Sequence, residues 1–333
     1  MIMKAHWLIP GKFDDISILS NSMLASIRLR SNICSDYLTR SNFFVTAGDF
    51  PGSDIDILFI GKIGADCSLG RSQLWKDTIK RHSENSLIIL DYTDNHLATP
   101  FSPMGQFYSD ILYSLDGSTA SSYFLAKALN TYWPGEVNVI EDPIDVPIIA
   151  KIKYSQNETP TILWFGHSSN IIYLINFLEN NLSKNITFNL LLLSNLDGLK
   201  LFFGHTLKIQ ANISISAAEW STANMISAAS ECDACIIPSN PSDSRKAGAS
   251  SNRLITAFAL GLPTAASNLS SYLPFQDYYF SLESGDFDFF LSNLTKYRKE
   301  VAFAQKRVVP LFSTEMLGNK WCTVVDKFLT LKK

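Results

Sequence analysis

The chain has 333 residues, of which 46% are apolar and 18% charged, and a formal net charge of −3. The chain is longer than a typical single domain and fits two globular domains, and the composition excludes a largely disordered protein. No apolar run reaches the roughly 18 residues of a membrane span, the amino-terminal apolar stretch is too short for a signal peptide, and the five scattered cysteines do not resemble a disulfide framework. We therefore expect a cytoplasmic protein.

Short apolar strands alternate with helical patterns in the first half of the chain, which predicts a mainly parallel sheet covered by helices. Strands are predicted within residues 4–11, 42–48, 54–61, 86–92 and 136–147, helices over 16–33 and 71–82, and two helices flanking a short strand over 107–129. The polar, proline-terminated residues 151–160 are predicted to form an interdomain linker.

The same alternation restarts after the linker. Strands are predicted within 161–169, 186–194, 213–220, 233–239 and 263–267, with helices over 170–182, 222–231 and 251–261. In the last helical pattern Trp321, Val324, Val325 and Phe328 share one face, so this helix should pack on another surface. The expected architecture is α/β, with two Rossmann-like doubly wound domains over residues 1–150 and 151–310, and a carboxy-terminal helix in 311–333 that packs back on the first domain.

The charge is unevenly distributed along the sequence. Residues 1–147 carry 11 Lys and Arg against 17 Asp and Glu, whereas residues 148–333 carry 17 against 14. The second half is therefore better suited to receive an anion. Neither half is strongly basic, which argues against nucleic acid as the main partner.

In parallel sheets, ligands bind beyond the carboxyl ends of the strands, where backbone amides of helix starts point outward. The residues at these positions are Gly11, Lys12, Asp94 and His96 in the first half, and Gly166, His167, Ser168 and Glu219 in the second. For Asp94 and His96, two interpretations stay open. They form a structural strand-end turn, or they act catalytically by orienting an acceptor hydroxyl.

The stretch "SDSRKAGASSNRLITAFALGLPTAAS", residues 242–267, places Lys246 and Arg253 on either side of a helix start near Asn252. One interpretation is a solvated loop before a helix. The other is a site where two cations and the free helix amides, with Ser251 and Asn252, hold a diphosphate. No G-x-G-x-x-G or P-loop motif is present. Cys232 and Cys235 form a C-x-x-C without a second ligand pair, so no metal site is predicted.

The order of these motifs resembles a known family. "CDACIIPSN", "RKAGASSNRLITAFALGLPTAAS", "IILDYTDNHL" and "VNVIEDPID" are similar to GT-B glycosyltransferases of the retaining, glycogen-synthase-like group, in particular a bacterial subset with Lys-Ser-Asn-x-Arg. The resemblance implies two domains facing a central cleft, a nucleotide-sugar donor on the second domain, an acceptor on the first, and a role in glycan biosynthesis. It implies that Lys246 and Arg253 contact the diphosphate, that Gly166 to Ser168 lie under the phosphates, and that no metal or other cofactor is needed.

One departure from the family pattern concerns two glutamates spaced eight positions apart, the second of which binds the donor ribose. Here these positions hold Gly248 and Thr256, which lack a carboxylate. Three alternatives follow: another group such as Glu219 replaces the carboxylate, donor affinity is weak, or the protein does not catalyse.

The leading hypothesis is thus a metal-independent hexosyltransferase-like enzyme that moves a sugar from a nucleotide sugar to a glycan, lipid-linked or protein acceptor. A catalytically silent nucleotide-sugar or glycan-binding scaffold, and a nucleotide-sugar epimerase, are the alternatives. The basic residues of 295–307 form either a solvated helix face or a peripheral contact with the inner face of a membrane.

Overall fold

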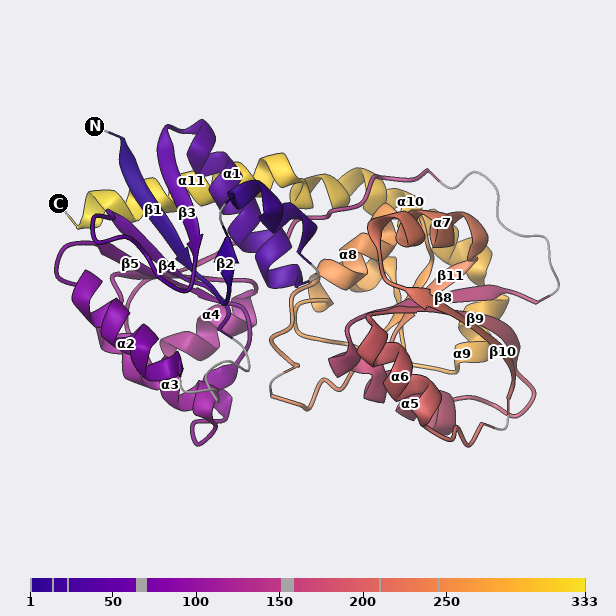
Figure 1. The fold of residues 1–333 in the computed structure, drawn as a ribbon. Coiled ribbons are helices and arrows are strands. Elements are labelled where there is room, and N and C mark those ends of the chain that lie inside the picture. The colour runs from indigo at the N-terminus through magenta and orange to yellow at the C-terminus, as the bar shows by residue number, and fades with distance from the viewer. Residues whose placement is uncertain are drawn as a thin grey trace. The chain divides into compact units, whose positions relative to one another are not determined.

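The computed structural model describes residues 2–13, 15–22, 24–63, 71–150, 159–209, 211–244 and 246–332. The chain divides into two compact units (Figure 1). The first unit comprises Met1–Pro143, Ser244–Ser250 and Ser313–Lys333, and the second comprises Ile144–Asp243 and Ser251–Phe312. The short segment Ser244–Ser250 thus belongs to the first unit, although it lies within the stretch expected to form the second domain. Residues 151–158 of the predicted linker lie outside the described residues.

The first unit is built on a seven-stranded sheet with the order β2-β3-β1-β4-β5-β6-β7. All neighbouring strands are parallel except β2, which pairs antiparallel with β3. The central strands are buried on both faces, as expected for a parallel sheet covered by helices. The strands are β1 (Met3–Leu8), β2 (Lys12–Phe13), β3 (Phe43–Gly48), β4 (Ile57–Ile60), β5 (Leu87–Tyr92), β6 (Gly117–Ala120) and β7 (Val137–Val139).

Helices cover both faces of this sheet (Figure 1). One face carries α2 (Arg71–His82), α3 (Pro103–Ile111) and α4 (Tyr123–Asn130), and the other carries α1 (Asn32–Arg40) and α11 (Thr314–Leu331). Helix α11 begins at Ser313, whose side chain accepts a hydrogen bond from the Met316 amide. Its apolar face, formed by Trp321, Val324, Val325 and Phe328, is buried in the core of the first unit.

The second unit contains a six-stranded, entirely parallel sheet with the order β10-β9-β8-β11-β12-β13. In order along the chain this is 3-2-1-4-5-6, the arrangement of Rossmann-type sheets. The predicted α/β class with two doubly wound units is therefore confirmed. The strands are β8 (Thr161–Phe165), β9 (Thr187–Ser194), β10 (Asn212–Glu219), β11 (Ala234–Ile237), β12 (Thr264–Ala266) and β13 (Phe280–Ser281).

Helices again lie on both faces of the second sheet, with α5 and α6 on one side and α7 and α8 on the other (Figure 1). Their bounds are α5 (Ile171–Asn180), α6 (Leu196–Gly204), α7 (Thr222–Glu231), α8 (Asn252–Ala259), α9 (Phe287–Ser292) and α10 (Leu294–Arg307). Every residue of α8 from Leu254 to Ala259 is buried, so this helix is fixed by packing. No helix in the described part of the chain is long and apolar enough to cross a membrane.

Candidate functional site

The topology of the second sheet creates a site at its carboxyl edge. The order of strands reverses between β8 and β11, and ligands of doubly wound sheets bind at such a switch point. Strand β8 ends directly before Gly166, which puts the predicted loop at this position. Leu193 pairs with Phe165 and Glu219 with Ser194, so the carboxyl ends of β8, β9 and β10 are aligned. At about 4.8 Å per strand, Glu219 lies roughly 10 Å from Gly166.

Arg253, in the first turn of α8, is the cation of this site. Its Nη2 donates a hydrogen bond to the Phe165 carbonyl, and its guanidinium lies over the Trp164 and Phe165 rings, 5.3 and 5.6 Å from the centroids. Its Nε is buried without a hydrogen-bond partner, and no carboxylate of the described residues forms an ion pair with it. Desolvation lowers the pKa of Arg253, as expected for a cation with no anionic neighbour.

The structure therefore brings Arg253 together with the Gly166 loop. A Cβ built on Gly166 would lie 3.3 Å from Arg253 Nη2 and 3.0 Å from the Trp164 ring. Glycine thus leaves the space beside the guanidinium open. The amino-terminal dipole of α8 adds further positive potential at the same place. A cation and a helix start without a counter-charge form a receptor for an anion.

The next two loop residues are engaged within their own turn. His167 Nδ1 accepts a hydrogen bond from the Ser169 amide at 3.3 Å. The Ser168 amide donates to Asn195 Oδ1 at 2.8 Å, so this amide already has an acceptor. Sequence reasoning missed Asn195, whose only signal was its position directly after β9, at the carboxyl edge of the sheet.

The start of α8 lies where the sequence predicted it. Ser251 is the N-cap residue, although its side chain makes no capping hydrogen bond, and Asn252 is the first helical residue. Thr256, at the position of the family's second glutamate, is buried among the apolar residues of α8, and its hydroxyl has no partner in the described structure. Its side chain therefore does not reach the surface beside Arg253.

In the first unit, Asp94 and His96 follow β5. The Lys62 ammonium forms an ion pair with Asp94, and His96 Nε2 lies 3.9 Å from Asp94 Oδ2. The imidazole stacks on Tyr108 with a centroid distance of 5.1 Å. These contacts hold both side chains at the carboxyl edge of the sheet. Lys62, at the end of the adjacent strand β4, was not predicted as a site residue.

Gly11 follows β1 at the same edge of the sheet, and Lys12 begins the short strand β2. Gly11 has a φ of 118°, which favours glycine, and its carbonyl accepts a hydrogen bond from the Asp49 amide at 2.8 Å. Lys12 is exposed and pairs with Gly48 in the short β2 strand. In sheet order, β1, β4 and β5 are neighbours, so Gly11 is separated from Asp94 by two strand spacings, about 10 Å.

Lys246 belongs to Ser244–Ser250, the segment that joins the first unit, which we call the docked loop. Three hydrogen bonds fix it at the ends of three adjacent strands. Asn95 Nδ2 donates to the Ser244 carbonyl at 3.2 Å, Ser122 Oγ donates to the Gly248 carbonyl at 3.0 Å, and Ser250 Oγ donates to Asp142 Oδ2 at 2.6 Å.

The docked loop explains the glycine at position 248. A Cβ at this position would lie 2.6 Å from Leu125 Cδ2, and Leu125 is fully buried in α4. A glutamate in place of Gly248 cannot be accommodated without displacing the loop. The departure from the family pattern at this position is thus a packing requirement of the first unit.

A buried ion-pair network in the first unit contacts the docked loop through Asp142. Arg30 donates to both oxygens of Asp91 and, at 2.9 Å, to Asp142, whose other oxygen accepts from Ser250. Arg30 and Asp91 are both buried, and the two carboxylates raise the pKa of Arg30 against the opposing effect of desolvation. Sequence reasoning missed this network because its members are far apart in the chain.

On α10, the basic residues do not form one uniform solvated face. Lys296 lies over the Tyr297 ring at 5.2 Å, Arg307 lies over Phe303 at 5.8 Å, and Arg298 approaches Asp233 at 4.0 Å. Contact of this helix with a membrane stays a prediction.

The described residues were also compared with the ligand sets of metal sites. Residues 2–63, 71–150, 159–244 and 246–332, with their short gaps, contain no group of three or more His, Cys, Asp or Glu suited to a metal.

Comparison with solved structures identifies proteins that share this architecture. HepE from Anabaena, solved with UDP-glucose, superimposes with a TM-score of 0.65 at 11% identity over 98% of this chain and 100% of HepE. An alpha-glucosyltransferase solved with UDP gives 0.64 at 10% identity, over 97% of this chain and 100% of its own. TarM from S. aureus gives 0.56 at 13% identity over 88% of this chain. The chain spans only 58% of the length of TarM.

No protein-family model and no curated protein matches the sequence. The structural similarities, at these low identities, are evidence of fold. The class that the two doubly wound units and these neighbours define is the GT-B fold of glycosyltransferases.

Proposed function

We propose that this protein is a glycosyltransferase that takes a UDP-activated sugar as donor and works without a bound metal. The observation that carries the proposal is the Arg253 guanidinium, which lies at a helix start, beside a glycine, with a buried Nε and no carboxylate partner among the described residues. The choice of UDP is supported by structural neighbours that were solved with UDP-glucose or UDP.

In this proposal the second unit binds the donor. Arg253 and the first amides of α8 hold the diphosphate, Gly166 allows it to approach closely, and Glu219 accepts hydrogen bonds from the ribose. Transfer breaks the bond between the anomeric carbon and the diphosphate and forms a bond from that carbon to an acceptor hydroxyl. Negative charge develops on the leaving UDP, and Arg253 stabilises it. A bound metal is therefore not required for this step.

The first unit, in the same proposal, receives the acceptor. Asp94 and His96 are held at the carboxyl edge by Lys62 and Tyr108, and they orient the acceptor hydroxyl, whose proton passes to the leaving diphosphate on the same face of the sugar. Retention of configuration at the anomeric carbon follows from the family resemblance in the motifs around Lys246 and Arg253.

Calorimetric titration of the purified chain with UDP-glucose, UDP and GDP-glucose tests the donor, in buffer with and without EDTA. We expect binding of UDP and UDP-glucose that EDTA does not weaken, and slow release of free glucose from UDP-glucose. Absence of binding by all three nucleotides contradicts the proposal. Binding that EDTA abolishes and magnesium restores contradicts metal independence.

A second candidate is a nucleotide-sugar-binding protein without catalytic activity. It is favoured by the lack of a carboxylate at both family positions, since Gly248 has no room for a side chain and Thr256 is buried. This candidate predicts binding of UDP-glucose with no hydrolysis and no transfer to any acceptor. The titration and the hydrolysis assay, carried out on one sample, separate the two functions.

A further inference from the structure

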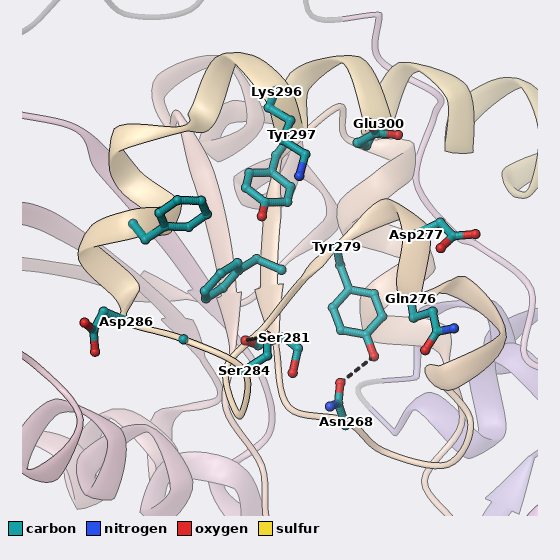
Figure 2. A pocket seen from close by; sticks show the side chains of 13 residues that line it. Asn268, Gln276, Asp277, Tyr279, Ser281, Ser284, Asp286, Lys296, Tyr297 and Glu300 are labelled. Atoms are coloured by element: carbon teal, nitrogen blue, oxygen red, sulfur yellow. Dashed lines mark hydrogen bonds between the residues drawn. The ribbon is translucent and has the colours of Figure 1, made fainter.

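A pocket of about 1050 Å³ lies at the outer edge of the second sheet, beside the edge strand β13. It is bounded by the loop after β12, by the 3-10 turn Leu273–Tyr278, and by α9 and α10 (Figure 2). Its place differs from that of the candidate donor site. Strand β13 is three positions from β8 in the sheet order, about 14 Å at the usual strand spacing. The pocket therefore needs an explanation of its own.

Aromatic rings form one wall of the pocket. Phe280 lies 5.9 Å from Tyr297 and 6.3 Å from Phe289, measured between ring centroids. Phe289 is 54% exposed, although it belongs to this cluster and is not at a chain end. An exposed ring within a polar-rimmed pocket offers a flat apolar surface to a ligand.

Two polar groups in the pocket have unused hydrogen-bonding capacity. Tyr297 is only 7% exposed, and its hydroxyl points into the pocket with no hydrogen-bond partner among the described residues (Figure 2). Tyr279 donates to Asn268 Oδ1 at 2.9 Å, which fixes the amide of Asn268 in the pocket lining and leaves its Nδ2 without a protein acceptor among the described residues. A hydroxyl that faces a pocket and has no protein partner is available to hydrogen-bond a ligand.

The charges around the pocket exclude an anionic ligand such as a nucleotide. Three carboxylates, Asp277, Asp286 and Glu300, stand against one ammonium, Lys296, which lies over the Tyr297 ring. Asp277 and Asp286 are exposed, whereas the buried residues of the lining, Tyr279, Phe280 and Tyr297, carry no charge. The inner surface is thus uncharged, with a flat apolar wall and hydroxyl and amide groups beside it.

We propose that this pocket is a binding site for a neutral glycan, separate from the donor site. A pyranose ring carries C–H bonds on its faces and hydroxyls around its edge, and this matches a ring wall with hydrogen-bonding groups next to it. The sugar face stacks on Phe289, and its hydroxyls bond to Tyr297 and Asn268. The exposed carboxylates accept further hydroxyl bonds. This inference goes beyond the proposed transfer reaction, because the site holds a glycan without a role in the chemical step.

Affinity electrophoresis of the full chain, through gels that contain amylopectin, dextran, laminarin or galactomannan, tests the site. We expect at least one of these neutral polysaccharides to retard the wild-type chain. Phe289→Ala should weaken that retardation on the order of tenfold, through loss of the stacking surface. Tyr297→Phe should weaken it about three- to tenfold, the effect of one hydrogen bond. Both variants keep the fold, because Phe289 is half exposed and Tyr297→Phe removes only the hydroxyl.

The matched control is Phe203→Ala on α6, which removes an equally exposed ring, 61%, from the same unit outside the pocket. It should leave the retardation unchanged, as should saturating UDP and the Arg253→Ala variant. Equal loss in the Phe203 and Phe289 variants, or no retardation by any of the four polysaccharides, overturns the proposal. Retardation that UDP abolishes shows that the glycan binds at the donor site, which overturns it as well. The titration with nucleotides tests the proposed donor site and the gel retardation tests the glycan site, so one proposal can be refuted without the other.

Discussion

Replacement of Arg253 by methionine should weaken the binding of a nucleotide diphosphate and leave the free energy of unfolding nearly unchanged. The guanidinium is desolvated, its Nε has no partner and its pKa is lowered by burial, so the charge opposes folding. Against this stand one hydrogen bond to the Phe165 carbonyl and the contacts with the Trp164 and Phe165 rings, which together contribute about 1–2 kcal/mol. Methionine keeps much of the apolar contact and removes the charge. The two effects nearly cancel, and we expect the stability to change by less than about 1 kcal/mol.

Binding of the diphosphate should respond quite differently. A charge-assisted hydrogen bond contributes about 1.5–3 kcal/mol, so Arg253→Met should weaken UDP binding by roughly one to two orders of magnitude. Calorimetry measures the affinity, and differential scanning fluorimetry should show a melting temperature within about 3 °C of the wild type. The control is Lys306→Met on α10, which should change neither quantity. Unchanged UDP affinity in the Arg253 variant, with measurable wild-type binding, refutes the assignment, and a strong loss of stability refutes the electrostatic argument.

Three further predictions concern the first unit. Burial lowers the pKa of His6 to about 4, so the unfolded state binds more protons between that value and the ordinary 6.5. Stability is thus lost as the pH falls through this window, by about 2 kcal/mol between pH 7 and pH 5, and urea unfolding of His6→Gln should show a flatter pH profile. Gly248→Ala should undock the loop and raise tryptic cleavage after Lys246 at least about fivefold. The control is Gly52→Ala, where a Cβ meets nothing within 4 Å, and it should not raise the cleavage. Equal cleavage in both variants contradicts the packing argument. Asp91→Ala leaves Arg30 buried with one partner fewer and should cost about 3–5 kcal/mol in urea unfolding, and a cost below 1 kcal/mol would show that the pair is not desolvated.

Local pattern was sufficient to predict most of the strands, but the single helix predicted over 16–33 was wrong, because this stretch forms a 3-10 helix, a π-helical turn and only the first residues of α1. The alternation of apolar runs and helical spacing gave two α/β units, and the polar residues before "NRLITAFA" predicted the start of α8, observed at Asn252. The apolar face of α11 was evident from the spacing of Trp321, Val324 and Phe328, all of which are buried. Strand ends could be located in the same way, and they supplied Gly166 and Asp94 as candidates, whereas Arg253 came from the predicted helix start.

The sequence by itself therefore determined the class of fold and the kinds of residue at the strand ends, because periodicity and capping act over a few residues. Only the tertiary structure decided which of them share a surface. It placed the docked loop in the first unit, where Gly248 has no room for a side chain, and it joined Arg30 to Asp91 and Asp142. It also left Arg253 without a carboxylate partner among the described residues and placed the Tyr297 hydroxyl in a pocket. These features depend on contacts between segments far apart in the chain, which short-range patterns do not specify.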